Sequence, residues 1–361
     1  MIQKNLMVAD QCFTIEWQTS KREELGGCDP VLLEKTIHAF ALLDAMAARG
    51  LEFVFKGGTS LLLRLPRIHR LSIDVDIFCQ EPAEKLDRLL VEISRIPPFT
   101  GMTEDDRGEH RIPARRHFRF SYKPIDPKNP APFVLLDVVH ERNVYPRVER
   151  VPLRTAFLES DGALLVPTVE GLLGDKLTAF GPNTTGVPLN EQRAMQFMKH
   201  VFDIGELFNA ASDLAAVRAA YDQVFAAENG FRGGKFTKEL ALQDTFDTAY
   251  RIAQVGFAIA PKDGRDELLD AGRKQIGSHL VGVKFRREEM KIAAAKAALL
   301  ASALRAAAVP AIGTLRYDET KLASLKDVKF DAAYSAAGKL KAIPEAMWLW
   351  AEALRLRGAI S

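Results

Sequence analysis

The stretch from Phe53 to Phe78 constrains the fold of this chain more than any other. Phe53 and Phe55 alternate with their neighbours, and the apolar run stops at two glycines. This pattern is typical of a short buried strand that ends in a turn. A leucine-rich run follows directly and predicts a helix, which Thr59 or Ser60 would cap. The order of strand, turn and helix indicates an α/β architecture.

The two glycines of the turn, Gly57 and Gly58, suggest a chemical role as well. Because they have no side chain, backbone N–H groups at the start of the predicted helix can approach an anion closely. Such a site suits a triphosphate. Most Gly-Gly pairs are ordinary turns, so this motif taken alone is not specific for phosphate.

Two carboxylates follow in a second predicted strand. Asp74 and Asp76 alternate there with Ile73, Val75 and Ile77, and residues two apart in a strand point to the same face. Two like charges side by side favour binding of Mg²⁺ or Mn²⁺, which often bridges to substrate phosphates. The alternative is a solvated strand face, since roughly one Asp-x-Asp is expected by chance in such a chain. Asp is a poor strand former, so its repetition here favours the metal site.

Together, the two motifs resemble those of a known family. Lys56-Gly57-Gly58-Thr59-Ser60-Leu61, followed by Arg70-x-Ser72-x-Asp74-x-Asp76, is similar to the paired motif of the AbiEii/AbiGii nucleotidyltransferase toxins. That family lies within the polymerase-β-like nucleotidyltransferase superfamily. The resemblance implies that Asp74 and Asp76 hold the metal ion. It also implies a nucleotide site formed by Lys56, Gly57, Gly58, Thr59, Ser60 and Ser72.

Asp137 is the third candidate carboxylate. It is the only acid inside the apolar run Phe-Val-Leu-Leu-Asp-Val-Val-His at 133–140, where burial without a partner would be costly. In the superfamily that the chain resembles, a third carboxylate from a neighbouring strand completes the metal site, and Asp137 stands where it is expected. Two metal ions would then activate the attacking hydroxyl and stabilise the leaving pyrophosphate. The alternative is an Asp at a strand end that is bonded to backbone.

The resemblance extends into the second half of the chain. Family members carry Lys-Leu on one helix and (Tyr/Phe)-Asp-(Leu/Ile) on the next, which correspond to Lys176-Leu177 and Phe202-Asp203-Ile204. Lys176 would neutralise charge on the nucleotide phosphates, and Asp203 would hold the lysine in place. Spacing alone predicts only a surface lysine in a helical salt bridge. Many members have Arg-Asp where this chain has Lys199-His200.

A basic run lies at 107–123, where six arginine or lysine residues and two histidines accompany one acid. Aromatic residues are interleaved with it, which would suit an RNA backbone track with stacking side chains. A solvated face is the alternative. The candidate stacking residues are Phe118, Phe120 and Tyr122, and the candidate RNA contacts are Arg115, Arg116 and Arg119. A second basic cluster at 273–291 is either an RNA-contacting face or solvated.

The pattern of apolar and polar residues along the chain predicts three parts. Residues 1–28 show no clear period and are expected to form an N-terminal extension that is partly extended or mobile. Residues 29–167 begin with a helix that Asp29 would cap, with Pro30 in its first turn, and continue with a helix at 83–95, a polar loop to about Pro113, and strands at 118–122, 133–140 and 144–151. From 168 to 361 the pattern is helical, and the first of these helices would complete the active site.

Composition agrees with a two-domain protein, because 361 residues that are 47% hydrophobic can bury two cores. We expect a cytoplasmic protein with free thiols, since there is no signal sequence, no run of transmembrane length, and only three scattered cysteines. The net charge of +2 does not exclude nucleic acid, because a local basic patch suffices to bind phosphates.

These observations predict an α/β (α+β) nucleotidyltransferase fold, a small mixed sheet flanked by helices, followed by an all-helical C-terminal domain. By resemblance, the activity is Mg²⁺-dependent transfer of a nucleoside monophosphate from an NTP to RNA, with the tRNA 3′ end as acceptor. The role would be a translation-blocking toxin of a toxin–antitoxin or phage-defence system, and the partner a cognate antitoxin. The alternatives are a protein or small-molecule acceptor, or a non-catalytic NTP- or RNA-binding module.

Overall fold

The computed structural model describes residues 8–105, 113–126 and 132–360. The chain divides into two compact units, one formed by Met1–Thr168 with Ser278–Val283 and the other by Val169–Gly277 with Lys284–Ser361. Within the described ranges, no helix is both long and apolar enough to cross a membrane.

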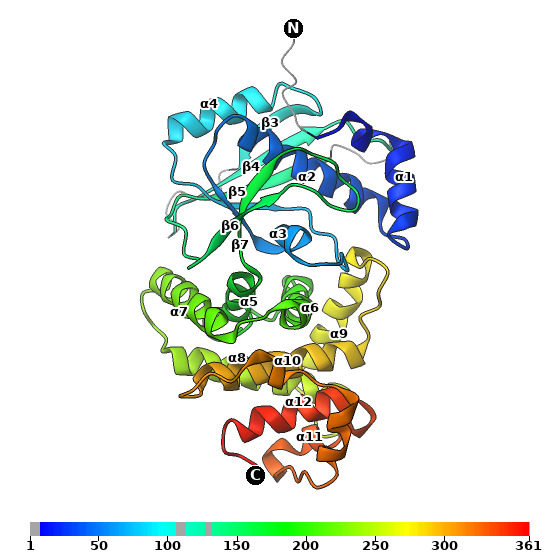
Figure 1. The fold of residues 1–361 in the computed structure, drawn as a ribbon, viewed down its shortest axis with the longest axis vertical. Coiled ribbons are helices and arrows are strands. Elements are labelled where there is room, and N and C mark those ends of the chain that lie inside the picture. Colours follow the sequence, from blue (N-terminus) through cyan, green and yellow to red (C-terminus); the bar gives the residue numbers. More distant parts are fainter. Residues whose placement is uncertain (1–7, 106–112, 127–131, 361) are drawn as a thin grey trace. The chain divides into compact units, whose positions relative to one another are not determined.

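The first unit is built on a seven-stranded mixed sheet (Figure 1). From one edge to the other, its strands are β3 (Phe99–Asp105), β4 (Arg115–Tyr122), β5 (Phe133–Val139), β2 (Val75–Phe78), β1 (Val54–Lys56), β7 (Ala163–Pro167) and β6 (Val148–Pro152). The pairs β2–β5 and β1–β7 are parallel, and the other neighbours are antiparallel. The predicted mixed sheet is confirmed, and β1, β2 and β5 lie side by side within it.

Helix α2 (Pro30–Ala48) supplies much of the core that the sheet packs against (Figure 1). Asp29 caps it as predicted, because its side chain accepts hydrogen bonds from the backbone N–H groups of Val31 at 2.9 Å and Leu32 at 3.0 Å. The helix contacts both β5 and β7. It is buried almost continuously from Leu33 to Met46, together with the alternate residues of the strands that face it.

Some elements of the first unit differ from the prediction. Residues 8–28 contain a 3₁₀ helix, η1 (Asp10–Phe13), and a helix, α1 (Ile15–Glu24), where the prediction was a partly extended or mobile segment. Only Gln18 of α1 is buried, so its sequence carries no apolar period. The expected polar loop after α4 (Ala83–Ile93) contains β3. This strand was missed because it lies at the sheet edge, where most side chains stay in contact with water.

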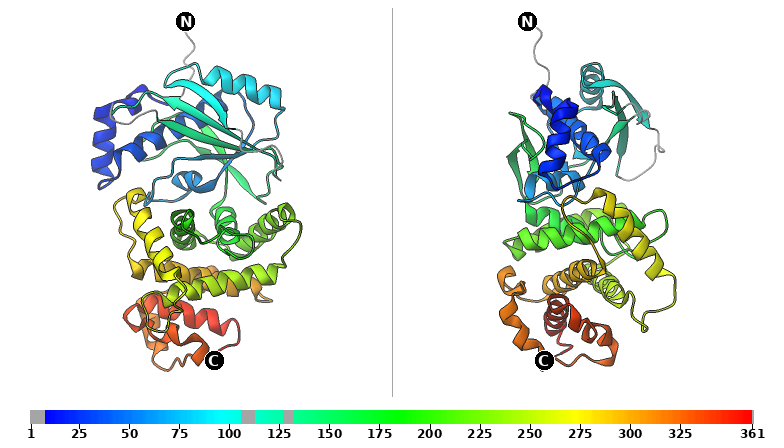
Figure 2. Two further views of the ribbon diagram at one scale, coloured as in Figure 1. Left: turned by 180° about the vertical axis from the view of Figure 1, so that it is seen from behind. Right: turned by 90° about the vertical axis from the view of Figure 1, so that its right-hand side faces the viewer.

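The second unit is helical, as predicted. Its helices are α5 (Val169–Thr178), α6 (Ala194–Ala210), α7 (Leu214–Phe231), α8 (Lys238–Gln254), α9 (Arg265–Gln275), α10 (Arg287–Arg305), α11 (Ser335–Gly338) and α12 (Pro344–Arg355). The alanine-rich α10 is the central element, because it packs against α6, α8 and α12. Figure 2 shows α8 and α10 running side by side.

A short segment from the second half of the chain belongs to the first unit. Ser278–Val283 pairs with the loop that leads from α3 (Gly57–Arg64) to β2. The N–H of Leu71 donates to the carbonyl of His279 at 2.8 Å, and the N–H of Val281 donates to the carbonyl of His69 at 2.9 Å. These bonds fix the backbone of the loop directly before the Ser-x-Asp-x-Asp sequence.

His38 makes the first unit sensitive to acid. Its ring stacks on Tyr122 with 3.7 Å between centroids, and its Nδ1 lies 2.8 Å from the Glu34 carbonyl, to which it donates. Burial lowers the pKa of His38 from 6.5 to about 4. As the pH falls, the unfolded chain therefore takes up this proton first. The contribution to stability is complete above the unfolded pKa and is lost between pH 6.5 and 4.

We expect the unfolding free energy of the wild type to fall by about 2 kcal/mol more between pH 7 and pH 5 than that of the His38→Phe variant. Phenylalanine keeps a stacked ring at this position but does not titrate. The measurement is urea denaturation of both proteins at both pH values. An equal loss in the two proteins would contradict this assignment.

Candidate functional site

Five ionisable residues form one row across the sheet. Strand register pairs Asp105 on β3 with His117 on β4, and His117 with Asp137 on β5. It also pairs Asp137 with Asp76 on β2, and Asp76 with Lys56 on β1. Residues paired in register project from the same face of a sheet. We call these five residues the polar row.

The polar row faces away from the core. Its neighbours along the strands, such as Leu136 and Val138 on β5 and Val75 and Ile77 on β2, are fully buried. Since successive side chains alternate between faces, the row lies on the opposite and more open side. The side chain of Asp137 is accordingly 26% exposed. The alternation of Asp76 with buried aliphatic residues is confirmed.

Gly57 makes room for the carboxylate of Asp76. Its φ of +77° is unfavourable for residues with a side chain, and a Cβ at this position would lie 3.0 Å from Cγ of Asp76. Gly57 is also the first residue of α3. The start of the predicted helix after the glycine turn therefore lies directly beside one carboxylate.

The two halves of the sequence motif contact each other at Gly58. A Cβ on this residue would lie 2.9 Å from Nη2 of Arg70 and 3.1 Å from Oγ of Ser72. Arg70 is only 7% exposed, and its Nη1 donates to the carbonyl of Leu71 at 3.1 Å. The guanidinium group of Arg70 thus packs against Gly58, and the Ser72 hydroxyl lies beside the same glycine.

Thr59 and Ser60 do not cap α3, so this prediction was wrong. The hydroxyl of Thr59 donates to the carbonyl of Asp74 at 2.5 Å, and that of Ser60 donates to the carbonyl of Gly57 at 2.8 Å. Both side chains are fully buried, and the capping position is held by Lys56 without a side-chain bond. The Thr59 hydroxyl instead ties the glycine turn to the backbone at Asp74, directly before β2, whereas the Ser60 hydroxyl bonds within the turn itself.

Asp137 has a partner that the sequence did not single out. Nδ1 of His117 lies 2.5 Å from Oδ1 of Asp137, and the His117 side chain is 10% exposed. An ionised carboxylate only accepts hydrogen bonds, so the imidazole N–H donates. The sequence pattern shows His117 only as one residue of a basic run. Only the register of β4 against β5 identifies it as the residue opposite Asp137.

The carboxylates supply suitable metal ligands without forming a closed site. In the part of the chain that the structure describes, no three His, Cys, Asp or Glu side chains are gathered as for a metal ion. Asp76 and Asp137 nevertheless share a register on parallel strands, whose backbones lie about 4.8 Å apart. Asp74 is exposed and precedes β2 directly. Carboxylate oxygens of this kind are the ligands that Mg²⁺ and Mn²⁺ prefer, so the donor set fits such an ion.

The predicted RNA track divides between the two faces of β4. Phe118, Phe120 and Tyr122 are buried in the core, so their assignment as stacking residues was wrong. The physical reason is alternation, which puts residues 115, 117 and 119 on the open face and the aromatics on the other. Arg107 and Arg111, which belong to the same run, lie outside the described residues.

Two of the three candidate arginines already have acidic partners. Arg116 pairs with Glu104 at 2.6 Å and with Asp87 at 2.7 Å. Arg119 pairs with Asp105 at 2.8 Å. Arg115, by contrast, is exposed. These acids neutralise part of the positive charge that the sequence of the run suggests. Contact between the run and RNA stays a prediction.

Phe133 provides an aromatic ring on the open face. It is opposite Ser121 in register and four residues from Asp137 along β5. Nζ of Lys35 lies 4.8 Å from the ring centroid, and Cζ of Arg119 lies 4.9 Å from it. Burial lowers the pKa of Lys35, and the Asp74 carboxylate opposes this shift. We call Phe133, Lys35 and Arg119 the Phe133 group.

The predicted lysine–aspartate pair forms within the second unit. Nζ of Lys176 on α5 lies 2.9 Å from Oδ2 of Asp203 on α6, and the two side chains are 7% and 2% exposed. The pair is buried, although spacing alone had predicted a surface salt bridge. Removing one partner would leave an uncompensated buried charge, which costs about 3–5 kcal/mol.

A family model for the nucleotidyl transferase AbiEii toxin of a type IV toxin–antitoxin system matches residues 41–308. The chain belongs to the AbiEii family. The matched range contains the glycine turn, the three carboxylates and the Lys176–Asp203 pair, so the resemblance inferred from these motifs is confirmed.

Solved structures that are similar to this AbiEii chain include one nucleotidyltransferase toxin. MenT4 from Mycobacterium tuberculosis H37Rv is 14% identical with a TM-score of 0.46, over 80% of this chain and 99% of that one. JHP933 from Helicobacter pylori is 12% identical with a TM-score of 0.40, over 81% of this chain and 93% of that one. None of the curated proteins compared with the chain matches it.

Three cations of the second basic cluster of this AbiEii chain make contacts within their own unit, and Lys274, Lys284 and Arg286 of the cluster are exposed. Arg273 pairs with Asp270 at 3.1 Å, and Arg287 pairs with the same acid. Lys291 is buried with its Nζ 3.7 Å from the Phe257 ring centroid, and burial lowers its pKa to about 8. These cations therefore stabilise the junction of α9 and α10 with the loop that follows α8.

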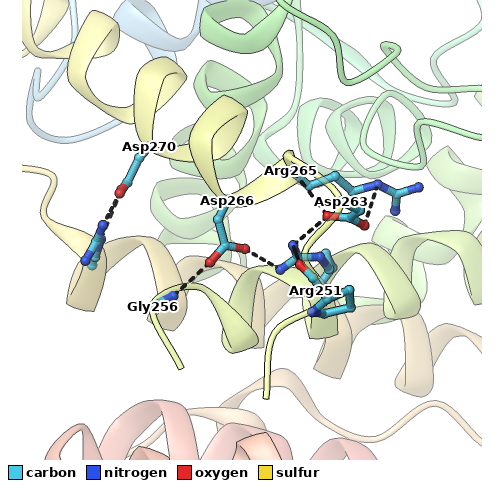
Figure 3. A network of polar contacts seen from close by, with 8 residues as sticks. Arg251, Gly256, Asp263, Arg265, Asp266 and Asp270 are labelled. Carbon is cyan, nitrogen blue, oxygen red and sulfur yellow. Dashed lines mark hydrogen bonds and ion pairs between the residues drawn. The ribbon is translucent and has the colours of Figure 1, made fainter. Parts of the chain in front are cut away.

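That loop is also held by Arg251. Figure 3 shows its guanidinium group between Asp263, at 2.9 Å, and Asp266, at 2.5 Å. Asp266 additionally accepts a hydrogen bond from the N–H of Gly256 at 3.1 Å. The polar contacts in Figure 3 thus fasten the residues between α8 and α9, and they lie far along the chain from the motif residues.

The glycine turn gives a stability test. We expect Gly57→Ala to lower the unfolding free energy by about 1–3 kcal/mol more than Gly50→Ala, because a side chain at 57 would overlap Asp76. Gly50 is a matched control, since its φ is +72° and a Cβ there would meet nothing within 4 Å. Denaturant unfolding of both variants measures the difference. Equal destabilisation would show that the Asp76 carboxylate does not lie against the turn.

Proposed function

We propose that this AbiEii-family chain transfers a nucleoside monophosphate from an NTP to a hydroxyl group of RNA, in a reaction that depends on a divalent metal ion. The observation that carries the proposal is the register of Asp76 with Asp137 beside the start of α3 at Gly57. It brings two potential metal ligands to the place where helix N–H groups can receive phosphates. The family match supports nucleotidyl transfer as the reaction.

The turn from β1 to α3 would bind the β- and γ-phosphates. Gly57 and Gly58 carry no side chains that would keep phosphate oxygens from the backbone N–H groups. Thr59 and Ser60 would shape the turn through the carbonyls to which they donate. Lys56 ends the polar row with a positive charge, and its Nζ lies 5.0 Å from the Phe78 ring centroid. This charge would offset that of the phosphates.

In the reaction, the acceptor oxygen bonds to the α-phosphorus while the bond from this phosphorus to the β-phosphate oxygen breaks. Pyrophosphate leaves, and the hydroxyl proton is released to the medium. Asp74, Asp76 and Asp137 would hold the metal and so orient the α-phosphate toward the acceptor. When bound, the metal would neutralise charge on the phosphates and favour ionisation of the attacking hydroxyl.

The Lys176–Asp203 pair is proposed to support the triphosphate, and this role rests on the family resemblance. Its chemistry fits, because Asp203 holds the lysine ammonium in one place at 2.9 Å. A fixed ammonium group stabilises developing negative charge without having to reorganise. The variant Lys176→Met would test the role by its effect on the KM for the NTP.

The Phe133 group supports a nucleic-acid acceptor. A ring on the open sheet face can stack on a base while Lys35 beside it contacts a neighbouring phosphate, and Arg119 is held beside the ring by its ion pair with Asp105. Ser72 and Asp74 of the motif lie in the same unit as this group. The Asp74 carboxylate acts against the lowering of the Lys35 pKa by burial. By resemblance, the acceptor would be the tRNA 3′ end, and its modification would stop translation.

The type IV toxin–antitoxin assignment of the family implies an antitoxin as the physiological partner. We propose that the antitoxin counteracts this enzyme, either in a toxin–antitoxin pair or in phage defence. The two other candidate functions are transfer to a protein or small-molecule hydroxyl and NTP or RNA binding without catalysis. Both are separated from RNA transfer by the experiments below.

The direct test is labelling of total tRNA with each α-³²P-NTP in the presence of Mg²⁺. We expect label from one NTP, reduced at least about 100-fold in Asp76→Asn and in Asp137→Asn, because each variant removes a metal ligand. Asp327→Asn, which changes an exposed acid of the second unit, should label as the wild type does. Full labelling by Asp76→Asn would contradict the site. Labelling of protein or of small hydroxyl compounds instead of RNA would support the other acceptors.

Phe133 gives a second test. We expect Phe133→Ala to raise the KM for tRNA about 5- to 100-fold, since stacking contributes about 1–3 kcal/mol per base. The KM for the NTP should stay the same, and Phe133→Trp should restore tRNA use because it keeps an aromatic face. Steady-state kinetics with each substrate varied in turn measures both constants. An unchanged KM for tRNA in the alanine variant would remove Phe133 from the acceptor surface.

A further inference from the structure

His117 lies between two acids in the polar row, and it is committed to one of them. In register it faces Asp105 on β3 and Asp137 on β5. Its Nδ1 lies 2.5 Å from Oδ1 of Asp137. Asp105 accepts a hydrogen bond from Nε of Arg119 at 2.8 Å. The sheet therefore directs the imidazole donor toward the carboxylate that is proposed to bind metal.

Among the strand neighbours of Asp137, His117 is the one that donates a hydrogen bond to its carboxylate. On the β2 side, the residue opposite Asp137 is Asp76, which is another acid. The residues that precede and follow Asp137 on β5 are Leu136 and Val138, which are buried and apolar. The other open-face residues of β4 are opposite Leu135 and Val139. The imidazole thus determines how this carboxylate is held before any ion arrives.

Holding one oxygen matters because a free carboxylate can rotate. With Oδ1 bonded to His117, the group keeps one orientation, and Oδ2 remains able to face Asp76 across the adjacent strand. Hydrogen bonds of this kind to metal-binding carboxylates commonly contribute 10- to 100-fold to metal affinity or activity. His117 is 8% exposed, so water competes little for its ring nitrogen.

We propose that His117 is a positioning residue that orients the Asp137 carboxylate for a divalent cation shared with Asp76. This inference rests on the proposed function. His117 makes no contact with substrate in this account. It acts through Asp137, because the hydrogen bond from its Nδ1–H keeps the carboxylate in one orientation.

The test compares Mn²⁺ affinity by electron paramagnetic resonance in the purified full-length variants. Asn keeps an N–H donor at about the position of Nδ1, whereas Leu removes it. We expect His117→Leu to weaken Mn²⁺ binding about 10- to 100-fold, and His117→Asn to remain within about threefold of the wild type. In the labelling assay, kcat should follow the same order while the KM for tRNA stays unchanged.

Asp105→Asn is the matched control, because it changes the acid on the other side of the same imidazole. We expect wild-type Mn²⁺ affinity in this variant. Wild-type affinity in His117→Leu would overturn the inference, and so would an equal loss in His117→Leu and His117→Asn at unchanged melting temperature. A loss in Asp105→Asn as large as in His117→Leu would also overturn it.

Failure of the inference can be told apart from failure of the proposed function. If Asp76→Asn loses Mn²⁺ and labelling while His117→Leu keeps both, the function stands and the positioning role is wrong. If the wild type neither binds Mn²⁺ nor labels any acceptor, both are wrong.

Discussion

The pairing of β2 with β1 on one side and β5 on the other is the constraint on which the rest of the structure depends. It aligns Lys56, Asp76 and Asp137 in one row, and the next pair of strands adds His117. A strand has a period of two, so a slip of one residue would turn these side chains into the apolar core. The buried Val75 and Ile77 on β2, and Leu136 and Val138 on β5, resist such a slip because they would become exposed. Core packing thus fixes the position of the charges.

Local features then adapt the backbone to this row. Gly57 lets Asp76 lie against the first turn of α3, and Gly58 accommodates Arg70 and Ser72 from the loop that follows. The segment Ser278–Val283 holds that loop by two backbone hydrogen bonds, although it comes from a distant part of the sequence. Because the glycine turn, the loop and the strands contact one another, a substitution in any of them would be felt at the carboxylates. This arrangement explains why the two halves of the motif occur together.

Much of this organisation could be predicted from the sequence, where local patterns are strong. The alternation around Asp76, the Asp29 cap and the helical second half all appear in the structure, whereas Asp74 lies directly before β2 and not within it. Register could not be predicted, because it depends on strands far apart in the chain. The sequence pattern therefore shows His117 as part of a basic run and Phe118 as a stacking residue, whereas the register of β4 puts them on opposite faces of the sheet. Edge strand β3 was missed because only Phe99 of its seven residues is buried, so its sequence carries no apolar period.

The central claim of this account is that Asp76 and Asp137 share one divalent cation beside the start of α3. The most direct measurement is anomalous diffraction from crystals grown with Mn²⁺ and a non-hydrolysable NTP analogue. The account predicts a manganese peak about 2–2.3 Å from an oxygen of each carboxylate, with the triphosphate at Gly57 and Gly58. A peak bound to only one of the two aspartates, or a triphosphate located away from the glycine turn, would contradict it.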